Sequence, residues 1–74
     1  MNLDAQLDRI VAARDRSNMQ PTIDALEPLY RAHPENPRVL YEIGGAYDTD
    51  GQEEKAANFY ERALAHGLSG DLLR

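Results

Sequence analysis

Apolar residues recur at intervals of three and four along four stretches of the chain, which is the spacing of one face of an α-helix. The stretches cover about residues 3–15, 21–33, 37–49 and 53–66, and turn residues separate them near 17–20, 33–36 and 50–52. No stretch alternates apolar and polar residues over the length of a strand. The pattern predicts an all-α chain of four helices.

Three positions between these stretches carry specific turn or capping chemistry. Asn36 and Pro37 suit the cap and the first position of the third helix, because the side chain of Asn accepts free N–H groups there and Pro needs none. Gly51 enters the next turn without steric cost. Pro28 is in conflict with a helix, since an internal proline costs about 3 kcal/mol. A helix that starts only at Pro28 would leave Ile23 and Leu26 in a loop, so we expect a kinked helix through Pro28.

Length and charge exclude several classes of protein. The chain has 74 residues, which is enough for one domain, and it has no cysteine, which excludes disulfides and thiolate metal sites. Its net charge is −5, with acids and bases interspersed, which disfavours nucleic acid and anionic membrane surfaces as partners. The N-terminus lacks the apolar run of a signal peptide, and no run reaches the roughly 18 apolar residues of a membrane span. We therefore expect a soluble protein of the cytoplasm.

The second half of the chain, residues 37–70, resembles a tetratricopeptide repeat. The family pattern is W-x2-L-G-x2-Y followed by A-x3-F and a proline, over about 34 residues. The positions that carry the resemblance are Leu40, Ile43, Gly44, Tyr47, Ala56, Tyr60 and Ala63, with Leu68 in place of the proline. Because two small residues allow antiparallel helices to approach closely, we expect Gly44 to face Ala56 or Ala63.

Residues 3–36 resemble a degenerate copy of the same repeat. Leu7, Ile10 and Val11 align with the Leu-Ile-Gly positions of the second copy, and Arg14 aligns with Tyr47. Val11 in place of glycine should widen the spacing of the first helix pair and loosen its packing. The resemblance thus implies a single domain, residues 1–74, folded as a short α-solenoid of two antiparallel helix pairs.

The resemblance also implies a function, because repeats of this family usually bind peptides or partner proteins in a concave groove lined by the first helix of each pair. The corresponding residues are Asp8, Ala12, Asp15 and Arg16 in the first repeat and Arg38, Tyr41, Gly45, Asp48 and Thr49 in the second. Tyr41 is the strongest candidate anchor, since tyrosine and arginine dominate interface energetics. Some members hold a C-terminal carboxylate with Lys and Asn, but Tyr41 and Gly45 occupy two of those positions here.

Catalytic, cofactor and metal sites find little support in the sequence. Ser17, Thr22 and Ser69 have no recognisable base and third group for nucleophilic catalysis. His33 and His66 come at equivalent ends of two helices, where a histidine complements the helix dipole. The acids at residues 48–54 do not complete a calcium-binding loop. We therefore expect no enzyme, no cofactor and no metal.

The end of the chain suggests a second role, a structural one in which the main partner is another copy of the chain. Repeat arrays usually need about three repeats and a capping helix, whereas this sequence stops where residues 71–74 begin a further helix. Either the chain is part of a longer array, or another chain covers its end. We expect a homodimer, through an apolar surface formed by Tyr60, Leu64, Leu68, Leu72 and Leu73.

Overall fold

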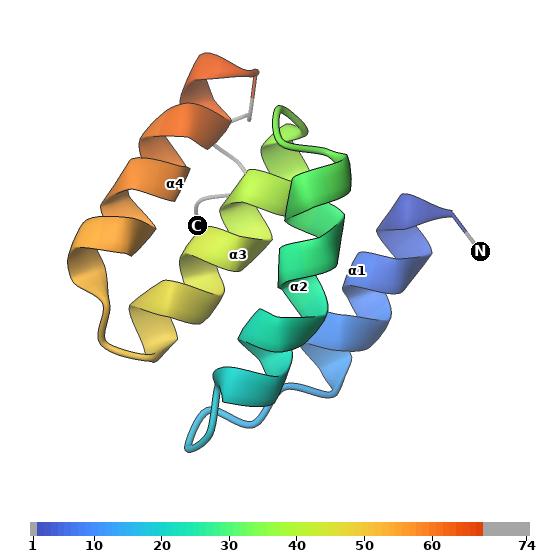
Figure 1. Cartoon of the computed structure of the whole chain (residues 1–74), viewed down its shortest axis with the longest axis vertical. Coiled ribbons are helices and arrows are strands. Elements are labelled where there is room, and N and C mark those ends of the chain that lie inside the picture. The colour runs from blue at the N-terminus through green and yellow to red at the C-terminus, as the bar shows by residue number, and fades with distance from the viewer. Residues whose placement is uncertain (1, 68–74) are drawn as a thin grey trace.

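The computed structural model describes residues 2–67, which form four helices and no strand (Figure 1). The helices are α1 (Leu3–Ala12), α2 (Gln20–Ala32), α3 (Pro37–Thr49) and α4 (Glu53–Ala65). An isolated backbone bridge joins Asp15 and Asn18 in the loop between α1 and α2. The predicted all-α fold of helix pairs is confirmed, and the expected helix start at residues 71–74 lies outside the described residues.

Local chemistry fixes the bounds of α3 where the sequence predicts them. The Asn36 side chain accepts hydrogen bonds from the backbone N–H groups of Arg38, at 3.0 Å, and Val39, at 3.1 Å. Pro37 occupies the first helical position, where its missing N–H costs nothing. After α3 the chain turns at Gly51, whose φ of 87° is a left-handed conformation that glycine adopts without strain.

The first two helices differ in their bounds from the prediction. α1 ends at Ala12 instead of near Asp15, because Asp15 makes a turn of its own. Its carboxylate accepts hydrogen bonds from the backbone N–H of Ser17, at 2.9 Å, and from the Ser17 hydroxyl, at 2.6 Å. These bonds also lower the pKa of Asp15. α2 continues through Pro28, as predicted.

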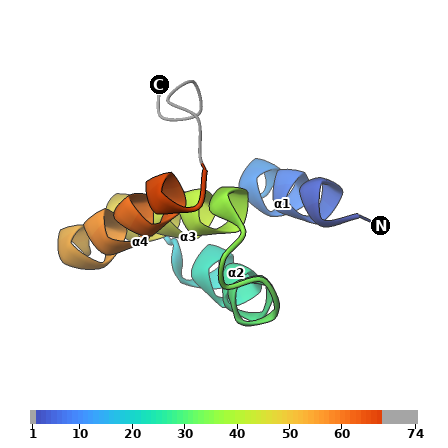
Figure 2. The same ribbon diagram turned by 90° about the horizontal axis from the view of Figure 1, so that it is seen from above.

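α3 lies at the centre of the arrangement and packs against all three other helices. In Figure 1, α4 lies on one side of α3, and α2 followed by α1 lies on the other. Seen from above, α4, α3 and α1 form a row, and α2 lies below α3 and α1 (Figure 2). This placement gives α3 two lateral surfaces, one toward α2 and one away from it.

Residues from all four helices form the core. The main cluster consists of Leu7, Met19, Ile23, Leu26, Val39, Ile43, Ala46, Tyr47 and Ala56, and a smaller one consists of Leu40 and Ala63. α1 contributes only Leu7 as a fully buried residue. A hollow of about 240 Å³ lies between the first two helices, lined by Arg9, Ile10, Ala13, Pro21, Thr22 and Ala25. The first helix pair is the more loosely packed one, as the sequence predicted, because α1 and α2 have fewer residues in contact than α3 and α4.

Gly44 lies at a close approach between α3 and α4, but its nearest neighbours differ from the prediction. A Cβ atom at Gly44 would lie 3.1 Å from Phe59 Cβ and 3.1 Å from Tyr60 Cε1. Ala56 and Ala63, the expected partners, lie one turn before and one turn after this contact and are buried in the two core clusters. The expectation was wrong because Gly44 lies opposite the middle of the α4 face and not opposite its small residues.

A bulky side chain at Gly44 should therefore separate the second helix pair. We expect Gly44→Leu to lower the free energy of unfolding by roughly 1–3 kcal/mol, because it overpacks against Phe59 and Tyr60. Gly45→Ala is the matched control, since a Cβ there meets only the Tyr60 hydroxyl, at 3.6 Å. The control should gain up to about 1 kcal/mol from helix propensity. Urea denaturation followed by circular dichroism measures both, and equal effects would contradict the close approach at Gly44.

Candidate functional site

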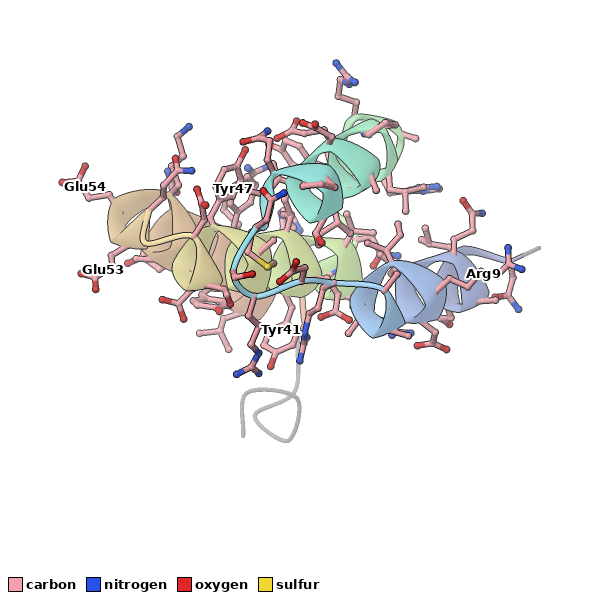
Figure 3. The ribbon with its side chains drawn as sticks, turned by 90° about the horizontal axis from the view of Figure 1, so that it is seen from below. Arg9, Tyr41, Tyr47, Glu53 and Glu54 are labelled. Carbon is pink, nitrogen blue, oxygen red and sulfur yellow. The ribbon has the colours of Figure 1, made fainter. Side chains whose placement is uncertain are left out.

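A groove of about 150 Å³ lies where the loop after α1 meets the other helices, on the surface of α3 that carries Tyr41. It is lined by Val11, Arg14, Arg16, Met19, Thr22, Leu26, Tyr41, Glu42, Gly45, Ala46, Asp48, Thr49 and Tyr60. All four helices and the loop after α1 contribute to this set. In Figure 3, Tyr41 and Tyr47 extend from opposite sides of α3, so the groove and the Tyr47 side chain lie on different surfaces.

Two half-buried tyrosines form the aromatic part of the groove. The ring centroids of Tyr41 on α3 and Tyr60 on α4 lie 5.8 Å apart, with the rings tilted by 41°. Burial, and next the negative charge of Asp48, raise the pKa of Tyr60. Gly45 has no side chain to fill the space beside the Tyr60 hydroxyl. The two rings therefore offer apolar surface next to accessible backbone.

The charged residues of the groove differ in sign between its two sides. Arg14 and Arg16 come from the loop after α1, whereas Glu42 and Asp48 come from α3. Glu42 is mostly buried, with 15% of its side chain exposed, and burial raises its pKa although Arg38 lies 3.5 Å from its carboxylate. A ligand that carries both a negative and a positive group would match this division of charge.

Five of the nine residues predicted to bind a partner line the groove, namely Arg16, Tyr41, Gly45, Asp48 and Thr49. The other four lie elsewhere. Arg38 and Asp8 form an ion pair with each other, and Arg38 also pairs with Asp4 at 3.1 Å, which ties α3 to α1. Asp15 is engaged in its own turn, and Ala12 is exposed at the end of α1.

Arg38 and Asp8, two of the residues predicted to bind a partner, are engaged in an ion pair with each other. The hydrogen bond that Arg38 donates to the Asp8 carboxylate is the largest of the interactions that raise the pKa of Arg38. The side chains of Asp4 and Asp8 are 73% and 68% exposed, so each pair contributes no more than about 1 kcal/mol. These ion pairs therefore position α1 against α3 more than they stabilise the fold.

Sequence reasoning missed eight lining residues: Val11, Arg14, Met19, Thr22, Leu26, Glu42, Ala46 and Tyr60. Glu42 could have been found, because it lies four residues after Arg38 and three before Gly45 on one helical stripe. Met19 and Tyr60 could not, since their place depends on how the loop and α4 cross α3.

Two of the five residues predicted for self-association, Tyr60 and Leu64, are among the described residues. Tyr60 is half-buried, packs against Gly44 and Tyr41 within the chain, and also lines the groove. Leu64 is 50% exposed on α4. Leu68, Leu72 and Leu73 lie outside the described residues.

Residues 2–67 contain neither a candidate metal cluster nor a helix that could cross a membrane. No group of three or more His, Asp or Glu side chains there is arranged to hold a metal ion. His33 and His66 follow directly after α2 and α4 as their C-caps. None of the helices α1 to α4 has the length and apolar character needed to cross a membrane.

Comparison with known proteins identifies the family. The family model described as tetratricopeptide repeat matches residues 37–74, which begin at the same residue as the second repeat read from the sequence. Neither the curated proteins nor the solved structures gave a match to the chain. The matched segment is half of the chain and contains α3 and α4. The chain belongs to the tetratricopeptide repeat family.

The buried Glu42 makes stability depend on pH in a direction that can be tested. Because its pKa is raised on folding, the folded chain holds this proton more tightly, and stability falls as the pH rises above the ordinary value of 4.5. We expect Glu42→Gln to be more stable than the wild type at pH 7, and the difference to shrink toward pH 4.5.

Urea denaturation at several pH values measures this difference. Glu54→Gln is the control, since Glu54 is exposed in the first turn of α4. A less stable Glu42→Gln at pH 7 would mean that the Arg38 interaction outweighs the cost of burial.

Proposed function

We propose that this member of the tetratricopeptide repeat family binds a segment of a partner protein in the groove, with Tyr41 as the main anchor and without catalysis. The observation that carries the proposal is the groove itself, in which all four helices meet beside two half-buried tyrosine rings. The family supports the same function, because its repeats serve as protein-interaction modules.

The size of the groove favours peptide side chains over a small molecule. Its volume of about 150 Å³ is below the roughly 300–1,000 Å³ typical of small-molecule pockets. Tyrosine rings supply a large contact area with few rotatable bonds, which is why they recur as interface hot spots. Arg16 on one side and Asp48 on the other would orient a bound peptide by its charges.

The same lining gives less support to catalysis. None of the lining residues is a His, Cys, Ser or Lys, the side chains that most often act as nucleophile or general base. The acids present, Glu42 and Asp48, share the groove with arginines, an arrangement suited to recognising charge. We therefore propose a binding module.

Replacing the aromatic anchor should weaken binding. Peptides selected from a displayed random library on the wild-type chain serve as probes, and isothermal titration calorimetry measures their affinity. We expect Tyr41→Ala to weaken binding by on the order of 2 kcal/mol, which is about thirtyfold, because a central tyrosine is lost. If the selected peptides bind Tyr41→Ala and the wild type equally, the proposal that they bind in the groove is wrong.

Because Tyr41 also packs on the smaller core cluster, a second pair of variants separates binding from stability. Gly45→Gln fills the groove with a residue that favours helix, so binding should be lost while the fold is kept. Gly45→Ala adds only a methyl group beside the Tyr60 hydroxyl and should keep most of the affinity. Equal binding by these two variants would place the peptide elsewhere.

We also propose self-association as a second function, because Leu64 is a large apolar side chain left half exposed on α4. A second copy of the chain could bury this side chain across a two-fold axis and form a homodimer. Burying one leucine contributes about 1.5–3 kcal/mol before the cost of association is subtracted.

Sedimentation equilibrium tests the homodimer. We expect the wild type to dimerise and Leu64→Asp to be monomeric, because a carboxylate would be buried in the interface. Ala57→Asp is the control, since it adds the same charge at an exposed position two turns earlier on α4. A wild-type chain that remains monomeric at millimolar concentration would exclude this second function.

A further inference from the structure

A second hollow, of about 270 Å³, lies on the opposite side of α3 from the groove. It is lined by Tyr47 of α3 and by Lys55, Asn58, Phe59 and Arg62 of α4. Figure 3 shows Tyr47 extending toward α2, away from Tyr41. We call this site the Lys55–Arg62 hollow; none of its residues lines the groove.

Contacts within the chain hold the aromatic floor of this hollow in place. The rings of Tyr47 and Phe59 are parallel, with centroids 5.6 Å apart, and Tyr30 meets Phe59 edge-on at 5.1 Å. The Tyr47 hydroxyl donates a hydrogen bond of 2.7 Å to Glu27. Burial contributes most, and this hydrogen bond next, to raising the pKa of Tyr47 to about 12. The floor is therefore preorganised and needs no rearrangement to accept a ligand.

Two cations lie over these rings. Lys55 Nζ is 5.1 Å from the centre of the Tyr47 ring, and Arg62 Cζ is 5.7 Å from that of Phe59. Arg62 is held in position because it donates hydrogen bonds to the Tyr30 hydroxyl, at 2.6 Å, and to the Pro34 carbonyl, at 3.2 Å.

Neither cation has a carboxylate partner within the part of the chain that the structure describes, where every ion pair involves Arg38. A carboxylate group supplied by another molecule would complete both interactions.

We propose that the Lys55–Arg62 hollow binds an acidic peptide segment in which two carboxylates flank an apolar side chain. Lys55 and Arg62 are seven residues apart on one helix, which separates their backbones by about 10 Å. In an extended segment, side chains at positions i, i+2 and i+4 share one face, so two carboxylates that flank an apolar side chain are about 13 Å apart, within reach of the long Lys55 and Arg62 side chains. The apolar side chain would pack between the aliphatic stems of Lys55 and Arg62, against the half-buried Phe59 ring, and the Asn58 amide would hydrogen-bond the backbone of the segment.

Charge argues against a second copy of this chain as the occupant. In a two-fold antiparallel packing of α4 centred on Asn58 and Phe59, Lys55 of each copy would oppose Arg62 of the other. Like charges opposed in this way repel, so such a pairing is disfavoured. The volume is below that of most small-molecule pockets, which leaves a peptide segment as the best match.

Nuclear magnetic resonance titration of the ¹⁵N-labelled chain tests the proposal. The probe is a capped heptapeptide Gly-Asp-Ser-Phe-Ser-Asp-Gly, and the control peptide has Asn in place of both Asp residues. We expect saturable shifts at the amides of Lys55 and Arg62 and at the Asn58 side-chain amide, with no shift at Gly45. The Asn peptide should bind at least about fivefold more weakly, since it lacks the charge attraction.

Variants distinguish binding in the hollow from attraction by the overall charge of the chain and from binding in the groove. We expect Lys55→Gln to weaken binding of the acidic probe by about fivefold, whereas Arg9→Gln, which removes one positive charge from α1, should leave it unchanged. Tyr41→Ala should also leave it unchanged, so failure at one site does not decide the other. Equal losses in Lys55→Gln and Arg9→Gln, shifts that map to the groove, or no saturable shift at millimolar peptide would each overturn the proposal.

Discussion

The close contact between α3 and α4 at Gly44 determines where both candidate sites lie. Because Gly44 has no side chain, α4 comes so close to α3 that a Cβ atom at Gly44 would lie only 3.1 Å from Phe59 Cβ and from the Tyr60 ring. These two residues are adjacent in sequence but lie on different surfaces of α3. Tyr60 joins Tyr41 in the groove, and Phe59 stacks on Tyr47 in the Lys55–Arg62 hollow. One packing contact therefore supplies an aromatic ring to each site.

The two helix pairs differ in how they are held. The second pair has the Gly44 contact and the aromatic stack, whereas the first has one fully buried residue on α1 and a hollow beside it. α1 is positioned against α3 by Arg38 and two largely exposed carboxylates. Such exposed pairs are weakened by salt. The loop after α1 forms one side of the groove and carries Arg14 and Arg16. The positive charge of the groove therefore comes from the less tightly packed part of the fold.

Electrostatics distinguishes the two surfaces of α3. Arginines and carboxylates line the groove, whereas the charged residues that line the hollow, Lys55 and Arg62, are both cations. The Glu27 carboxylate borders the hollow through its hydrogen bond with Tyr47. The two proposed sites therefore differ in the charges that they would present to a peptide.

The sequence by itself determined the four helices, the bounds of α3 and the family, because caps such as Asn36 and Pro37 and the stripe that includes Tyr47 act over a few residues. It misplaced the end of α1, where the Asp15 side chain competes with the helix for the backbone. Only the tertiary structure decided the sites. Arg38 finds carboxylates 30 and 34 residues away, and Tyr60 reaches the groove because α4 crosses α3 at Gly44. Such contacts depend on the angles between helices, which no local pattern specifies.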